Sequence, residues 1–128
     1  MRLTSLSGAG DPVKGEKNIM NDTSWIDREE YPFAPHRFKV SAGSLHYVDE
    51  GRGRPVVMIH GNPTWSFLYR HLIKRLCSEY RCIAMDHIGF GLSDKPKNWS
   101  YFPEDHAINL TQLIEDLELK NVTLAVQD

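Results

Sequence analysis

Val56-Val57-Met58-Ile59-His60-Gly61-Asn62-Pro63 joins a continuous apolar run to a loop that contains glycine and proline. An unbroken apolar run of this length is typical of a strand buried on both faces, as in a parallel sheet covered by helices. The segments 82–85 and 121–128 have the same character and predict two further buried strands. The sequence therefore predicts a sheet with a covering layer on each side.

Two helices are predicted between these strands. One begins near Pro103, whose fixed φ suits a first turn, and Glu104 and Asp105 favour the positive end of its dipole. The other spans 65–76, where the apolar residues repeat with the 3.6-residue period of a helix. The predicted inner face of the helix 65–76 consists of Trp65, Leu68, Tyr69, Leu72, Ile73 and Leu76. That of the helix that begins near Pro103 consists of Ala107, Leu110, Ile114 and Leu117.

The segments 38–40 and 45–48 flank Ala42-Gly43 and predict an antiparallel hairpin ahead of the parallel strands. The order is therefore hairpin, strand, helix, strand, helix, strand, which indicates the α/β class with helices on both faces of the sheet. Residues 1–30 lack apolar periodicity and are expected to form a flexible arm, so residues 31–128 make one domain. Met20 is a second possible start, in which case residues 1–19 are dispensable.

Composition excludes several functional classes. The chain has 128 residues, is 41% hydrophobic and carries a net charge of −2, with its basic residues scattered rather than clustered as nucleic-acid binding requires. No apolar run approaches the roughly 20 residues that span a bilayer, and no signal peptide is recognisable, so a cytoplasmic location is expected. Cys77 and Cys82 are expected to be buried free thiols. The histidines other than His60, at positions 36, 46, 71, 87 and 106, show neither metal-ligand spacing nor a shared face, and no cofactor is expected.

In sheets of this kind, ligands bind beyond the carboxyl ends of the strands. Three segments meet that criterion: the loop 60–64, the loop 86–93 and Asp128. They are far apart in the sequence, but the predicted topology brings them together. The sequence therefore predicts that the functional site lies where these three segments converge.

The motifs in these segments resemble those of the haloalkane dehalogenase family of the α/β-hydrolase fold. His60-Gly61-Asn62-Pro63-Thr64-Trp65 resembles the loop after the third strand of that family, and Asp86-His87-Ile88-Gly89-Phe90-Gly91-Leu92-Ser93-Asp94-Lys95-Pro96 resembles the loop after the fourth. Val126-Gln127-Asp128 resembles the approach to the family's nucleophile. The resemblance runs from about residue 31 to residue 128. It implies the N-terminal portion of the fold, without the C-terminal half and the lid.

The resemblance also implies a chemistry. Asp128 would be the nucleophile that displaces halide and forms an aspartyl ester, which a histidine-activated water then hydrolyses. The side chain of Asn62 would donate to the departing halide and its backbone N–H to the oxyanion. His60 would brace the loop, and Asp86 would hydrogen-bond the loop that follows it. The implied partners are a small apolar halogenated substrate and water, with no nucleic acid or membrane; the oligomeric state is left open.

Alternatives remain at this point. Asp128 could instead be a helix N-cap, Asn62 a turn former and Trp65 part of the core or of a pocket wall. An epoxide hydrolase would use the same fold and nucleophile, although many of those enzymes have an aromatic residue at the position of Asn62 and arginine at that of Ile88. A non-catalytic fragment is a further alternative. The resemblance places the base after residue 128, so the chain alone is expected to be poorly soluble and unable to turn over.

Overall fold

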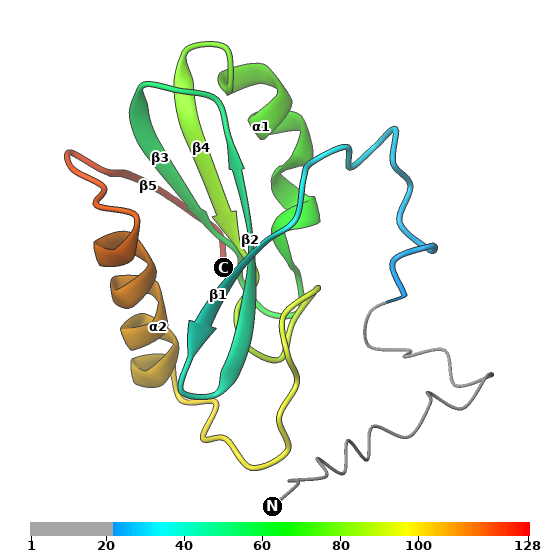
Figure 1. Cartoon of the computed structure of the whole chain (residues 1–128), viewed down its shortest axis with the longest axis vertical. Helices are drawn as coiled ribbons and strands as arrows, with labels where there is room; N and C mark the ends of the chain where they lie inside the picture. The colour runs from blue at the N-terminus through cyan, green and yellow to red at the C-terminus, as the bar shows by residue number, and fades with distance from the viewer. Residues whose placement is uncertain (1–21) are drawn as a thin grey trace, which may run out of the picture.

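The computed structural model describes residues 22–128, which fold around one five-stranded sheet with the strand order β1-β2-β4-β3-β5 (Figure 1). The expected elements are present in the expected order, which confirms the predicted α/β class. The strands are β1 (His36–Val40), β2 (Gly43–Glu50), β3 (Arg54–Ile59), β4 (Tyr80–Met85) and β5 (Thr123–Val126), and the helices are the 3₁₀ helix η2 (Ser66–Tyr69), α1 (Arg70–Leu76) and α2 (Pro103–Asp116).

The sheet combines an antiparallel hairpin with parallel strands. β1 pairs antiparallel with β2 through a tight turn in which Val40 lies opposite Gly43, and Gly43 has a φ of 140° that disfavours a side chain. β3 pairs in parallel with β4 on one side and with β5 on the other. The carboxyl ends of β3, β4 and β5 therefore point to the same edge of the sheet.

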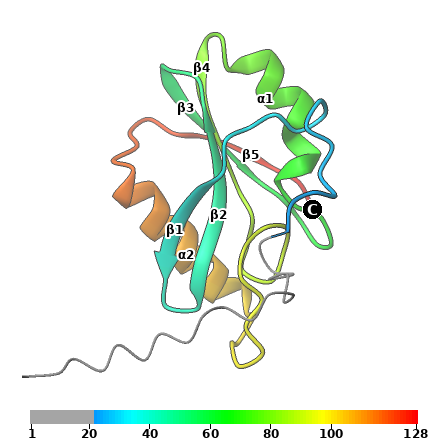
Figure 2. The same ribbon diagram turned by 45° about the vertical axis from the view of Figure 1, so that its right-hand side comes forward.

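The helices cover opposite faces of the sheet, as Figures 1 and 2 show, with α1 on one side and α2 on the other. Successive strand residues alternate between the two cores. Met58 of β3 packs in the cluster that includes Ile73 of α1, whereas the adjacent Val57 packs in the cluster that includes Leu113 of α2. Both strand faces are thus buried, which explains the unbroken apolar runs in the sequence.

The predicted first helix differs from the observed one in form and in face. Residues 66–69 form a 3₁₀ helix, and α1 begins only at Arg70. Because a 3₁₀ helix has 3.0 residues per turn, the phase of the buried face shifts relative to a continuous α-helix. Tyr69 and Ile73 are buried as predicted, but Leu68 is 41% exposed and Leu72 is 38% exposed.

The second helix spans the predicted residues, but its inner face is rotated. The fully buried residues of α2 are Asn109 and Leu113, whereas Ala107, assigned to the inner face from the sequence, is exposed. Leu110 and Leu117 are partly buried and pack against the core of this face. A search for apolar periodicity passes over Asn109 because its side chain is polar, although Asn109 lies where the helix meets the sheet.

β5 is not the buried strand that the sequence predicts. It forms one edge of the sheet, and within residues 22–128 it pairs only with β3. Leu124 is 54% exposed and Val126 is 71% exposed. Val122, two residues before Leu124 and on the same face of the strand, packs in the core under α2. This face is therefore buried by α2 at Val122 and exposed at Leu124.

The segment before β1 packs on the face that carries α1. Ile26 and Tyr31 are buried, and Glu30 accepts a hydrogen bond from Arg70 at 2.9 Å. A flexible arm is expected over residues 1–30. Residues 1–21 lie outside the described part of the chain, and residues 22–30 make these contacts. In the described part of the chain no helix has the length and apolar character needed to cross a membrane.

Both cysteines are free thiols, as expected. Cys82 is buried in β4, where burial raises its pKa to about 11. Cys77, at the end of α1, is only partly buried, in contrast to the sequence-based expectation.

Candidate active site

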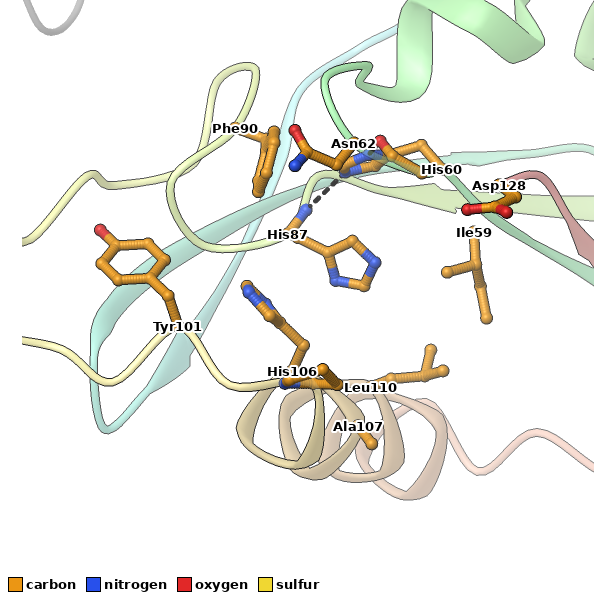
Figure 3. A pocket seen from close by; sticks show the side chains of 12 residues that line it. Ile59, His60, Asn62, His87, Phe90, Tyr101, His106, Ala107, Leu110 and Asp128 are labelled. Atoms are coloured by element: carbon orange, nitrogen blue, oxygen red, sulfur yellow. Dashed lines mark hydrogen bonds between the residues drawn. The ribbon is translucent and has the colours of Figure 1, made fainter.

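A cavity lies at the carboxyl ends of the parallel strands, where the three predicted segments converge (Figure 3). Its volume is about 620 Å³. The loop after β3, the loop after β4, the start of α2 and the end of β5 all contribute to its wall, so the predicted convergence is confirmed. The lining residues are Ile59, His60, Gly61, Asn62, His87, Phe90, Tyr101, Pro103, His106, Ala107, Leu110 and Asp128.

Asn62 and Asp128, the two predicted site residues, both line this cavity. The backbone of Gly61 lies directly against that of Asp128: a Cβ atom added at Gly61 would be 2.6 Å from the carbonyl carbon of Asp128. The N–H of Gln127 donates to the carbonyl of Ile59 at 3.2 Å, which continues the β3–β5 pairing up to this point. The structure thus brings both residues to one site, while their chemical roles remain predictions.

The loop after β3 is fixed by its own hydrogen bonds. The N–H of Thr64 donates to the Gly61 carbonyl at 3.0 Å, and the Thr64 hydroxyl donates to the same oxygen at 2.8 Å. His60 is 3% exposed, and its Nδ1 lies 2.8 Å from the Gly61 carbonyl, while its Nε2 accepts from the N–H of His87 at 2.9 Å. These two contacts require the proton on Nδ1. Both ring nitrogens are engaged, which matches the expected bracing role of His60.

Asp86, at the end of β4, connects several elements behind the cavity and is fully buried. As expected, it hydrogen-bonds the following loop, where it accepts from the N–H of Leu92 at 2.9 Å. It also accepts from the N–H of Ser66 at 2.7 Å and from Nδ1 of the buried His46 at 2.9 Å. Burial by itself raises the pKa of Asp86, but these hydrogen bonds and the His46 charge outweigh it and hold the pKa below the ordinary value.

His46 was not predicted as a site-supporting residue. It lies in β2, and its contact with Asp86 joins positions 40 residues apart. No local sequence pattern encodes such a contact. Gly89 and Gly91, in the loop after β4, both have positive φ values, of 94° and 51°, which favour glycine. A side chain at Gly91 would also collide with the carboxylate of Asp86.

The expectation that the histidines other than His60 share no face is wrong for His87 and His106, whose rings gather beside that of His60. The ring centroids of His60 and His87 are 4.6 Å apart, and those of His87 and His106 are 4.9 Å apart. All three rings line the cavity, because the loops after β3 and β4 and the first turns of α2 meet there. Within residues 22–128, no group of three or more His, Cys, Asp or Glu side chains is arranged to hold a metal ion.

Burial lowers the pKa of His87 to about 4, and the neighbouring rings of His60 and His106 act in the same direction. Burial likewise lowers the pKa of His106, with a smaller contribution from His60. Both imidazoles are therefore uncharged at neutral pH. They add hydrogen-bonding capacity to the cavity without adding positive charge.

Trp65 belongs to the core rather than to the cavity wall. Its ring stacks on Phe67 with centroids 5.4 Å apart and lies 5.2 Å from the ring of Tyr31. It is partly buried and packs against the cluster on the α1 face. This position agrees with one of the two structural alternatives for Trp65 and leaves Asn62 as the side chain of this loop that is available to a ligand.

Residues 54–126 match the family described as alpha/beta hydrolase fold. This match covers more than half of the chain. The chain belongs to the α/β-hydrolase fold family. Within that family it corresponds to the N-terminal part of haloalkane dehalogenases.

The chain is 44% identical over 102 residues to haloalkane dehalogenase 2 of Mycobacterium tuberculosis, covering 80% of this chain and 36% of that protein. It is 46% identical over 100 residues to the cis-3-alkyl-4-alkyloxetan-2-one decarboxylase of Shewanella oneidensis, covering 76% of this chain and 31% of that protein. Among solved structures, haloalkane dehalogenase DatA from Agrobacterium tumefaciens superposes with a TM-score of 0.69 at 38% identity, over 74% of this chain and 32% of that one.

The chain spans about a third of the length of the relatives that it matches. The family match over residues 54–126 includes both loops of the cavity and β5. The two relatives, one named a dehalogenase and one a decarboxylase, match this chain at similar identities.

Proposed function

We propose that this chain supplies the nucleophile and the halide-binding amide of a haloalkane dehalogenase-like hydrolase. Asp128 is the nucleophile and Asn62 is the amide. The observation that carries the proposal is that these two residues, distant in the sequence, line one cavity at the carboxyl ends of the parallel strands. The similarity to haloalkane dehalogenases supports the choice of leaving group.

The first step is a displacement at carbon. A carboxylate oxygen of Asp128 attacks the carbon that carries the halogen, a carbon–oxygen bond forms, and the carbon–halogen bond breaks with its electron pair on the halide. The amide N–H of Asn62 donates to the halide as charge develops on it. The product is an alkyl ester of Asp128, and the halide leaves the cavity.

The second step is hydrolysis of this ester. Water attacks the ester carbonyl carbon and loses a proton to a base, the backbone N–H of Asn62 donates to the oxyanion, and the alcohol leaves. The family resemblance places this base after residue 128. The 128-residue chain by itself is therefore expected to stop at the ester.

A β-lactone decarboxylase is the second candidate, favoured by the 46% identity to an oxetan-2-one decarboxylase. Asp128 would open the ring by attack on C4, the saturated carbon bonded to the ring oxygen. The C4–oxygen bond breaks, and the ring oxygen becomes part of a free carboxylate. Loss of CO2 would then form a carbon–carbon double bond and expel the carboxylate of Asp128. These reaction steps consume no water and need no base. The chain alone could therefore complete the decarboxylase reaction, whereas it is expected to stop at the ester in the dehalogenase reaction.

Parallel incubations of the purified chain separate the candidates. With 1-bromobutane, a dehalogenase-like site releases at most one bromide per chain, and a butyl ester accumulates. With a cis-3,4-dialkyloxetan-2-one, a decarboxylase site releases CO2 and alkene over many cycles. With 1,2-epoxybutane, an epoxide hydrolase site accumulates a hydroxybutyl ester. Asp128→Asn should abolish whichever reaction occurs, and Asp116→Asn, a change at an exposed position on α2, should leave it unaltered.

A further inference from the structure

Two histidine rings in the cavity each have one buried nitrogen without a hydrogen-bond partner. Nδ1 of His87 and Nδ1 of His106 are both buried, and neither has a partner in the described part of the chain. Figure 3 shows the two rings between the loop that carries Asn62 and the helix α2, with His87 above His106. A buried polar atom left without a partner costs on the order of 1–3 kcal/mol, so this arrangement needs an explanation.

The burial of Nδ1 indicates which nitrogen carries the proton. A neutral imidazole has one N–H donor and one bare acceptor nitrogen. An orphaned buried N–H group is rarer in proteins than an under-satisfied acceptor. The proton is therefore placed on Nε2 in both rings, and neither Nε2 is among the buried atoms of the described residues that lack a partner. His60 shows the opposite, satisfied arrangement, with both nitrogens bonded to the backbone.

The cavity thus presents N–H donors from His87 and His106 on a largely apolar wall. Ile59, Phe90 and Leu110 supply much of that wall. Both imidazoles are uncharged at neutral pH because burial lowers the pKa of each. Neutral donors in apolar surroundings favour a neutral acceptor over an anion, since the desolvation cost of an anion would not be offset by an opposite charge.

We propose that His87 and His106 form a hydrogen-bond-donating subsite for a mainly apolar molecule that carries a carbonyl or ether oxygen. The inference rests on the proposed function in that it concerns the same cavity, and it narrows the substrate class. An unfunctionalised haloalkane would fill the apolar wall but leave both donors unpaired. An oxygen-bearing molecule would satisfy them and be held in a defined orientation.

The test uses two probes of matched shape, cyclopentanone and cyclopentane. The ¹⁵N signals of the histidine rings are followed by NMR in the 128-residue chain as each probe is added. Cyclopentanone should shift the Nε2 signals of His87 and His106 in a saturable way, and cyclopentane should not. The exposed ring of His71, whose side chain is 68% accessible, serves as an internal control and should not respond.

Variants test the donors directly. His87→Leu and His106→Leu should each weaken cyclopentanone binding about 10-fold, the effect of one lost hydrogen bond of about 1.4 kcal/mol. His87→Gln keeps an N–H donor and should bind more tightly than His87→Leu, while His71→Leu should match the native chain. Amide spectra show whether each variant is folded, and the native-chain titration decides the question if a leucine variant unfolds.

Three results would overturn the inference: equal binding of the two probes, binding unaffected by both leucine changes, or no binding because a second chain closes the cavity. Ester formation on Asp128 by 1-bromobutane involves neither the ketone nor these rings. The subsite and the proposed function can therefore fail independently.

Discussion

Asp86 is the residue on which the geometry of the cavity loops depends most. It is fully buried and joins β2, the loop after β4 and the start of η2 through three hydrogen bonds. We expect Asp86→Asn to lower the free energy of unfolding by about 3 kcal/mol, because it leaves His46 without its charged partner and places an amide where N–H groups donate. Urea unfolding at pH 7 measures the change. A loss below 1 kcal/mol would show that the pair contributes little.

The carboxyl group of Asp86 should also make the free energy of unfolding depend on pH. The pKa of Asp86 is lower in the folded state than its ordinary value of 3.8. Its contribution to stability is therefore complete above that ordinary value and is lost as the pH falls through the folded pKa. The free energy of unfolding of the native chain should decrease below about pH 4, and the Asp86→Asn variant should show a shallower decrease. Parallel acid titrations followed by tryptophan fluorescence compare the two, and identical curves would contradict this assignment.

Gly61 sets the distance between the two predicted site residues. A Cβ atom at this position would lie 2.6 Å from the carbonyl carbon of Asp128 and 2.7 Å from the carbonyl oxygen of Gln127, both backbone atoms that cannot rotate away. Gly61→Ala should therefore push Asp128 away from Asn62 and slow ester formation about 100-fold. Rapid-quench mass spectrometry with 1-bromobutane gives the rate. An unchanged rate in a folded variant would show that this contact does not position the nucleophile.

At the residue scale, the sequence predicts those features that follow from local pattern and strand order. Asn62 and Asp128 lie one or two residues beyond apolar runs, so the parallel topology predicts that they meet. The contact between His46 and Asp86 could not be predicted, because it depends on how β2 registers against β4. The cluster of His60, His87 and His106 was missed for a related reason, since three different elements contribute one ring each.

At the scale of elements, strand positions were predictable but helix faces were not. Each predicted strand is present, because continuous apolar runs and a hairpin turn are local signals. η2 replaces the first turn of the predicted helix, and the N–H of Ser66 at its start donates to Asp86, a contact that apolar periodicity does not report. Asn109 faces inward on α2 although it is polar. In both helices a buried polar residue lies on the inner face, which a search for apolar periodicity does not detect.

The exposed edge strand β5 is expected to promote self-association of the chain in solution. Its exposed Leu124 and Val126 lie next to backbone groups that have no strand partner on the outer side within residues 22–128, an arrangement that favours strand-to-strand association. Leu124→Lys should reduce self-association by placing a charge on this edge. Thr123→Lys adds the same charge on the opposite strand face and serves as the control. Sedimentation velocity measures both, and an unaltered distribution in Leu124→Lys would show that association involves another surface.

At the scale of the whole molecule, we expect these 128 residues by themselves to complete only the first step of the proposed dehalogenase reaction. Replacing the corresponding segment of the Mycobacterium marinum haloalkane dehalogenase, which is 45% identical over 107 residues, with residues 31–128 should give sustained bromide release from 1-bromobutane. The isolated chain should release at most one bromide per molecule. Asp128→Asn in the graft should abolish release. Sustained release by the isolated chain would show that residues 1–128 already contain a base.

Peptide mass spectrometry of the isolated chain after incubation with 1-bromobutane shows whether Asp128 attacks carbon in the cavity that it shares with Asn62. One butyl ester is expected, located on Asp128; it should form more slowly in Asn62→Ala and be absent in Asp128→Asn. An unmodified chain, or a butyl group that persists in Asp128→Asn, would contradict it.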